Sequence, residues 1–159
     1  YRFSNPVVEE LRDRQVRSVL GNHDIGLLGP NGVAARGNSG VHADLVAHLG
    51  DYPLSMEVDV GGGKKLLMTH ASPCAPYNQY VFKGSAELKR MVDIEVDFVI
   101  IGHSHTQMVE RVGRALVINP GSAGQATDPT NGRQLSCAVL DTSTDEVVVH
   151  DYLVPVPVS

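Results

Sequence analysis

Short apolar runs alternate with polar, glycine-rich stretches along the chain, and this pattern predicts the regular elements. Helical spacing begins at Ser4 or Asn5 with Pro6 at the first helical position, and helices are also expected over 42–49 and 85–92. Strands are predicted over residues 16–20, 56–60, 64–69, 96–101, 114–118, 135–141 and 146–154. The strands at 56–60 and 64–69 flank three consecutive glycines and form a hairpin, and the last two strands form an antiparallel pair. Residues 25–40 and 72–84 are predicted to be loops.

Four of the apolar runs end in a burst of side chains that can bind metals or donate hydrogen bonds. The bursts are "GNHD" at 21–24, His70, "GHSH" at 102–105 and "NPGS" at 119–122. In α/β sheets, ligands bind outside the carboxyl ends of the strands. The pattern therefore predicts an α/β fold in which four strand ends meet around one site.

The histidines at these strand ends are candidate metal ligands. His103 and His105 are one residue apart, and a turn after Gly102 would let the two rings point to different ions. His70 ends the apolar run of "LLMTH". The plain structural alternative is that His103 and His105 are solvated loop residues and that His70 is a satisfied residue at the edge of the core.

The "GNHD" stretch offers three different chemical groups in succession. Asn22 supplies an amide oxygen that a borderline cation accepts, and His23 is a natural proton donor near neutral pH. Asp24 can orient the His23 imidazole, as carboxylates do for functional histidines. The alternative is an Asx-type turn that carries an incidental histidine.

The "NPGS" stretch has no titrating side chain, so its backbone amides and the Ser122 hydroxyl are either anion contacts or parts of a tight structural turn. His42, His48 and His150 lack a comparable setting and are assigned to surface or packing roles.

Composition narrows the function classes. The 159 residues suffice for one domain with a hydrophobic core, and 42% of them are hydrophobic. The net charge of −5 with no basic stripe argues against nucleic-acid binding. Cys74 and Cys137 lie far apart, so we expect no disulfide framework and a reducing, cytoplasmic compartment. No apolar run reaches transmembrane length, and no membrane association is expected.

Taken in order, "GNHD", the histidine of "THASP", "GHSH" and "NPGS" resemble the motifs of the calcineurin-like metallophosphoesterases. The chain is most similar to their small bacterial and archaeal phosphodiesterase branch, where "NPGS" is often followed by the Gly-Gln seen here at 124–125. The resemblance implies a single metallophosphoesterase-like domain over 1–159. Its fold would be a two-sheet α/β sandwich flanked by helices.

The same resemblance implies a site with two divalent ions, Mn²⁺, Fe or Zn²⁺. Matching motif positions assign Asn22, His70 and His103 to one ion and His105 to the other. His23 takes the position of the proton donor with Asp24 behind it, and Asn22 and His23 would contact the substrate. The implied reaction is hydrolysis of a small phosphodiester by a hydroxide that bridges the two ions.

The chain departs from the family pattern in its carboxylates. The family begins with an Asp-x-His strand end and a Gly-Asp strand end, and neither precedes "GNHD" here. In the family the aspartate of Gly-Asp bridges the two ions. The pair Gly50–Asp51 comes after "GNHD", so it is rejected as this bridging ligand. A smaller departure is Ala71, which stands where the family usually has glycine. We expect an upstream strand-helix-strand segment that the chain as given lacks. The alternative is a degenerate site.

Three other functions compete with phosphodiester hydrolysis. A degenerate site would suit a protein-binding scaffold, similar in type to the retromer subunit of this fold. Phosphomonoesters or phosphoproteins are alternative substrates, and a His-x-His amidohydrolase is disfavoured because its motif belongs on the first strand of a longer barrel. In the predicted loop, Tyr77, Asn78, Tyr80 and Lys83 lie near the expected mouth, where aromatic rings would either stack on a nucleotide base or pack within the loop. We expect no stable nucleic-acid partner.

Overall fold

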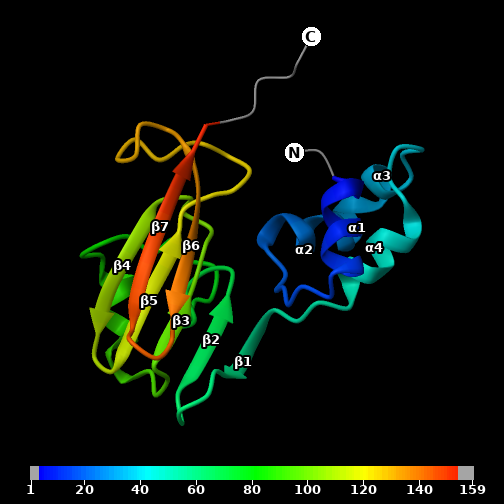
Figure 1. Cartoon of the computed structure of the whole chain (residues 1–159). Helices are drawn as coiled ribbons and strands as arrows, with labels where there is room; N and C mark the ends of the chain where they lie inside the picture. The colour runs from blue at the N-terminus through cyan, green and yellow to red at the C-terminus, as the bar shows by residue number, and fades with distance from the viewer. Residues whose placement is uncertain (1–3, 154–159) are drawn as a thin grey trace. The chain divides into compact units, whose positions relative to one another are not determined.

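The computed structural model describes residues 4–153, which fall into two compact units (Figure 1). The first is Tyr1–Ser55 and the second is Met56–Ser159, and each is described by itself. The single domain expected over 1–159 stays a prediction. No helix in the described range 4–153 has the length and apolar character needed to cross a bilayer.

The first unit is helical. Its elements are α1 (Asn5–Asp13), α2 (Asn22–Leu28), the 3-10 helix η1 (Pro30–Gly32), α3 (Val33–Arg36) and α4 (Ala43–Gly50). The predicted first helix and the helix over 42–49 are confirmed. Asn5 ties α1 to the segment before α4, because its side chain donates to Gly40 O at 2.8 Å and accepts from His42 N at 3.1 Å.

Two predictions for this unit are wrong. Residues 16–20 form no strand, because no segment of the described chain pairs with them in a ladder of hydrogen bonds. A described backbone bond joins them to a distant segment, from Leu20 N to Pro53 O at 2.9 Å. Residues 25–40 are not a loop but hold most of α2, η1 and α3. Their glycines serve close packing as well as turns, since a Cβ on Gly32 would lie 1.8 Å from Leu27 O.

The second unit is built on a five-stranded sheet in the order β1-β2-β3-β5-β4. The strands are β1 (Ser55–Asp59), β2 (Lys65–Thr69), β3 (Phe98–Ile100), β4 (Gln107–Val112) and β5 (Ala115–Pro120). The strands β2, β3 and β5 are parallel to one another, and β4 is antiparallel to β5. The predicted strands over 56–60, 64–69, 96–101 and 114–118 are confirmed with shifted ends. Strand β4 is an addition, because its alternation is interrupted by charged Glu110 and Arg111.

Each face of this sheet is covered by another layer. On one face lie α5 (Ala86–Lys89) and the 3-10 helix η2 (Arg90–Asp93), whose Leu88 and Met91 join a core with Val99 and Val117. The predicted helix over 85–92 is thus confirmed, and Ser85 Oγ caps it by accepting from Leu88 N at 3.2 Å.

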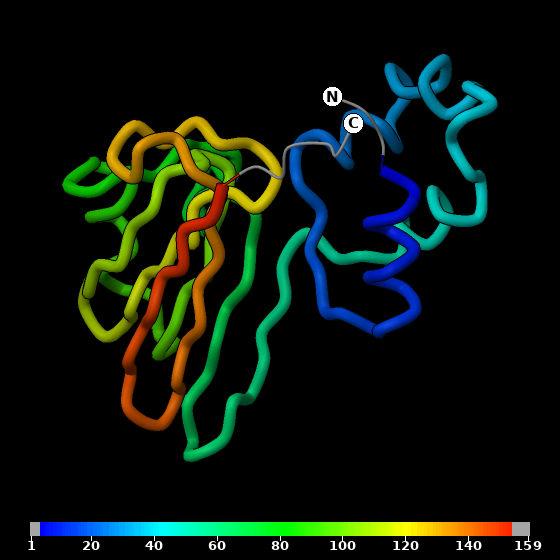
Figure 2. Tube along the Cα trace, turned by 45° about the horizontal axis from the view of Figure 1, so that its top comes forward, coloured from blue at the N-terminus to red at the C-terminus, as the bar shows by residue number. Residues whose placement is uncertain are grey.

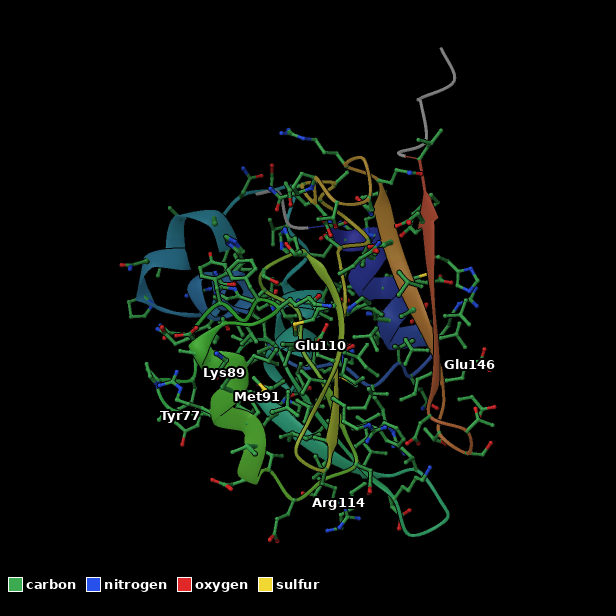
Figure 3. All side chains as sticks on the ribbon, turned by 90° about the vertical axis from the view of Figure 1, so that its left-hand side faces the viewer. Tyr77, Lys89, Met91, Glu110, Arg114 and Glu146 are labelled. Atoms are coloured by element: carbon green, nitrogen blue, oxygen red, sulfur yellow. The ribbon has the colours of Figure 1, made fainter. Side chains whose placement is uncertain are left out.

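The opposite face carries the antiparallel pair β6 (Leu135–Asp141) and β7 (Glu146–Tyr152). Leu140 and Val147 pack against a core of Phe98, Leu116 and Ile118. Figure 2 shows this hairpin running along the sheet. Figure 3 shows three layers edge on, in which Met91 marks the helical layer, Glu110 the five-stranded sheet and Glu146 the β6–β7 pair. The two-sheet α/β sandwich is confirmed. The last residue of the predicted final strand, Val154, lies outside the described residues.

Candidate functional site

Three parallel strands of the second unit bring their carboxyl ends to one edge of the sheet. His70 follows β2, Gly102 and His103 follow β3, and Asn119 is near the end of β5. The loops themselves are joined, because Gly102 N donates to His70 O at 2.9 Å. Three of the four predicted strand ends therefore meet, as parallel pairing requires.

His70 and His103 face each other directly. The distance from His70 Nε2 to His103 Nδ1 is 3.1 Å, and the ring centroids are 4.9 Å apart in an edge-on arrangement. Two imidazole nitrogens on one ion, each about 2.1 Å from it at about 90–109°, lie about 3.0–3.4 Å apart. The pair therefore fits two neighbouring positions of a metal's coordination sphere.

The backbone that carries the two "GHSH" histidines is left-handed. His103 has φ of 64° and His105 has φ of 56°, a region that non-glycine residues adopt at a cost. The residues are thus not on a continuing strand, and the predicted turn after Gly102 is confirmed. Such a conformation persists only where surrounding contacts hold it.

Asn119 supplies those contacts. Its side chain is completely buried, and its Nδ2 donates to Gly102 O at 2.8 Å and to Ser104 Oγ at 2.9 Å. Its Oδ1 accepts from Gly121 N at 3.0 Å. Asn119 is therefore the brace between the ends of β3 and β5. Sequence reasoning missed this role, although the signal was an amide at the end of an apolar strand.

The rest of "NPGS" is a structural turn. Ser122 Oγ accepts from Gly124 N at 3.3 Å and from Gln125 N at 2.9 Å. Gly121 has φ of 86°, and a Cβ there would lie 2.1 Å from Ser136 Oγ. The turn thus joins the site edge of the sheet to β6, where Ser136 N donates to Ser122 O at 2.9 Å.

Tyr80 stacks on His103, with ring centroids 4.0 Å apart and planes 13° from parallel. Phe82 lies on the stack as well, 6.2 Å from the Tyr80 centroid at 14°. Tyr80 therefore packs on a site histidine while it is 54% exposed, and the stacking of a nucleotide base on this loop stays a prediction. Tyr77 is 71% exposed and takes no part in this described stack.

Asp128 holds the segment that follows the two histidines. It is 2% exposed, and its carboxylate accepts from Gln107 N at 2.8 Å, Thr130 N at 2.8 Å and Thr130 Oγ1 at 2.6 Å. Burial raises the pKa of Asp128, but these hydrogen bonds outweigh burial and leave the pKa below its usual value. The carboxylate is therefore charged at neutral pH and fixes the start of β4.

In the first unit, "GNHD" opens helix α2. Asp24 Oδ2 accepts from Gly21 N at 2.8 Å, which closes the turn that carries Asn22 and His23. The predicted strand end is therefore a loop-to-helix junction. The orientation of His23 by Asp24 stays a prediction.

These three residues also line a pocket within the first unit. It has a volume of about 670 Å³ and is bordered by α2, η1, α3 and the turn before α4. Asn22 and His23 are exposed, so a ligand in the pocket would reach both.

The predicted metal ligands are spread over the two units. Asn22 is in Tyr1–Ser55, whereas His70, His103 and His105 are in Met56–Ser159. Among residues 4–153, no three His, Cys, Asp or Glu side chains form a metal-binding group. The structure thus brings two predicted ligands together, the imidazoles of His70 and His103. Metal binding by these two residues, by Asn22 and by His105 stays a prediction.

The profile of the calcineurin-like phosphoesterase superfamily domain matches residues 3–145. The chain belongs to this family. The match covers the region of all the motifs named above and confirms the resemblance. It assigns the chain to a family of phosphoester hydrolases.

The chain is also similar to a curated protein. A protein of uncharacterized function from Methanocaldococcus jannaschii is 31% identical over 153 residues, which cover 80% of this chain and 61% of the relative. The chain thus spans about three fifths of that relative's length.

Two solved structures share the fold. A metallophosphoesterase from Sphaerobacter thermophilus has a TM-score of 0.65 at 21% identity, over 93% of this chain and 71% of the other. A structure described as a novel archaeal phosphodiesterase has a TM-score of 0.54 at 18% identity, over 94% and 77% of the two chains. At these identities the likeness shows the fold alone.

Proposed function

We propose that this protein is a metal-dependent phosphodiesterase acting on a small substrate. The observation that carries the proposal is the His70–His103 pair, 3.1 Å apart at the joined ends of two parallel strands. Imidazole nitrogens in this arrangement fit Mn²⁺, Fe or Zn²⁺ better than Ca²⁺, which prefers oxygen ligands. The similarity of "NPGS" and the following Gly124–Gln125 to the small phosphodiesterase branch favours a diester over a monoester.

Asn22, His70, His103 and His105 are the proposed ligands of two divalent ions. When bound, such ions supply Lewis-acid chemistry to water and to the phosphate oxygens. His70 Nε2 and His103 Nδ1 lie 3.1 Å apart, Asn119 holds the loop through Gly102 O, and Tyr80 stacks on the His103 ring. The chain's part in metal binding is thus preorganised by contacts that do not depend on the ion.

His23 is the proposed proton donor. Hydrolysis breaks the bond between phosphorus and the leaving alcohol's oxygen, and that oxygen needs a proton. A positioned imidazole contributes about 10²–10⁴ in rate through such a transfer. Asp24 keeps the turn closed through Gly21 N, and Asn22 contacts the phosphate.

The test is metal-stimulated hydrolysis of bis(4-nitrophenyl) phosphate and of 4-nitrophenyl phosphate by the full-length protein. We expect turnover with Mn²⁺, Fe²⁺ or Zn²⁺ and a preference for the diester. His23→Ala should lower kcat by about 10²–10⁴ while elemental analysis finds the metal content unchanged. His103→Ala should lose both metal and turnover.

His150→Ala is the matched control, because His150 is an exposed histidine on β7. It should keep both activity and metal. A preference for the monoester would show that the protein is a phosphatase and not a phosphodiesterase. Metal binding without turnover of either ester would favour the protein-binding scaffold. A cytoplasmic location is part of the proposal and rests on the two free cysteines, Cys74 and Cys137.

A further inference from the structure

The pocket of the first unit is a defined cavity with a rigid wall. Its volume of about 670 Å³ lies within the range of about 300–1,000 Å³ typical of small-molecule sites. Arg36 holds the wall, because its Nη1 donates to Gly29 O at 2.9 Å and also to Leu27 O. Gly32 packs so tightly on Leu27 that no side chain fits between them. The pocket is thus shaped by bonds between its own walls.

The lining has the chemistry of a site for a neutral ligand. Asn31 and Asn38 bring side-chain amides, and Leu27, Ala35 and Val41 bring small apolar patches. Asn38 Oδ1 is engaged by Gly40 N at 2.9 Å, so its NH₂ group is the part that can donate to a ligand.

Among the lining residues that the structure describes there is no Lys, Arg, Phe, Tyr or Trp, and Asp24 is the carboxylate. The imidazole of His23 lies beside the Asp24 carboxylate, so the lining has no excess of positive charge to attract an anion, and it offers a flat base no ring other than His23.

We propose that this pocket binds the leaving alcohol of the substrate, and that this alcohol is a neutral polyhydroxylated group of about the size of a sugar. The inference rests on the proposed function, because His23 lines the pocket. In the reaction the phosphorus–oxygen bond to this alcohol breaks and a bond to the water oxygen forms. The leaving oxygen takes the His23 proton, and the proton lost by water passes to solvent. Hydroxyl groups suit these amides, because Asn31 can both donate and accept and the Asn38 NH₂ group can donate.

Binding is tested without turnover by titrating the full-length protein with myo-inositol, glucuronate and adenosine. Backbone amide resonances of Gly26, Gly32 and Gly40, which all line the pocket, report binding by NMR. Myo-inositol should shift these resonances saturably, and glucuronate and adenosine should bind at least about tenfold more weakly. Equal or tighter binding of either competitor, or no saturable shift with myo-inositol, would overturn the proposal.

Gly26 offers a clean way to fill the pocket. It lies within α2, and a Cβ there has no heavy atom within 4 Å, so the side chain of Gly26→Leu starts in open space and adds bulk to the pocket. We expect this variant to weaken myo-inositol binding by about tenfold or more. Gly37→Leu is the matched control, since Gly37 is in the same unit, meets ordinary contacts at 3.5 Å and does not line the pocket. It should bind as the wild type does.

Turnover distinguishes this inference from the proposed function. Methyl phosphate diesters that carry either a hexose or an ethyl group as the second alcohol are compared, with products identified by ³¹P-NMR. The wild type and Gly37→Leu should favour the hexose diester in kcat/KM, and Gly26→Leu should lose that preference. Inositol binding without any diester hydrolysis would refute the proposed function but not the pocket's role in binding a polyhydroxylated group. Hydrolysis without inositol binding, or without a hexose preference, would refute that role of the pocket.

Discussion

At the residue scale, the ring of His103 is held by neighbours that are themselves not metal ligands. Tyr80 stacks on one face at 4.0 Å, and Asn119 fixes the loop through Gly102 O. Because His103 sits at φ of 64°, these contacts offset a backbone conformation that is costly for histidine. The position of one imidazole nitrogen therefore depends on an aromatic ring and a buried amide.

Tyr80→Ala should weaken metal binding without removing a ligand. Loss of the stack frees the His103 ring, and supporting contacts of this kind are worth about 10–100-fold in metal affinity. Competition with a coloured chelator measures the effect. Tyr80→Phe keeps the ring and should stay close to the wild type. If Tyr80→Ala and Tyr80→Phe bind metal equally well, the stack has no positioning role.

Asn119→Ala should be strongly destabilising. The change leaves Gly102 O and Gly121 N without their buried partner, and each such group costs about 1–3 kcal/mol. We expect the free energy of unfolding in urea to fall by about 2–4 kcal/mol. Asn78→Ala, at an exposed site, should stay within about 0.5 kcal/mol of the wild type. A loss at Asn119 as small as that at Asn78 would contradict the bracing role.

At the scale of elements, the start of β4 depends on a carboxylate from a different loop. Asp128 accepts from Gln107 N, the first residue of β4, directly after the "GHSH" turn. The loop after "NPGS" thereby holds the segment that follows His103 and His105. This link also makes the stability of the second unit dependent on pH.

The sign follows from the pKa of Asp128. Burial raises that pKa, but the hydrogen bonds from Thr130 and Gln107 together lower it by more than burial raises it. The folded pKa therefore lies below the unfolded value of about 3.9. The carboxylate therefore stabilises the fold fully above the unfolded pKa, and this stabilisation is lost as pH falls through the folded pKa.

Asp128→Asn should be less stable than the wild type near pH 7, and the two should converge as the pH drops below about 4. Urea unfolding between pH 3 and pH 7 measures the difference. Hydrogen bonds also lower the pKa of three other aspartates, namely Asp97 (from Lys65 N), Asp141 (from Ser143) and Asp145 (from Lys64). These three are present in both proteins, so the difference between the proteins isolates Asp128. A gap between the variants that does not depend on pH would contradict the pKa argument.

At the scale of the whole molecule, the predicted ligand set is drawn from both units. Asn22 belongs to Tyr1–Ser55, and His70 and His103 belong to Met56–Ser159. Because a ligand that binds only the folded state stabilises that state, metal should raise the unfolding free energy by about 2.7 kcal/mol at 100 times the dissociation constant.

Asn22→Ala and His103→Ala should both reduce this metal-induced stabilisation, whereas His150→Ala should keep it. Thermal unfolding with and without Mn²⁺ or Zn²⁺ measures the shift in Tm. A full shift in Asn22→Ala together with none in His103→Ala would place the metal on the second unit alone. The predicted ligand set would then have to be revised at Asn22.

The sequence alone determined the α/β class from its local patterns, and the resemblance of its ordered motifs to a known family implied the two-sheet sandwich. Apolar runs of strand length, the Ser85 cap and the ordered motifs predicted the sheet, the helix after Ser85 and the strand ends that carry His70 and His103. Parallel pairing then required these ends to meet, and the distance of 3.1 Å between the two rings agrees with that.

Tertiary structure alone decided what depends on contacts between distant residues. Residues 16–20 have strand composition but no partner ladder, and residues 25–40 look like loop but fold as short helices held by packing such as that of Gly32 on Leu27. The brace at Asn119, the Tyr80 stack and the pocket beside His23 join residues far apart in the chain or in different elements. Local propensity carries no information on such pairings, since their energy comes from burial and hydrogen bonds that exist only after the chain has folded.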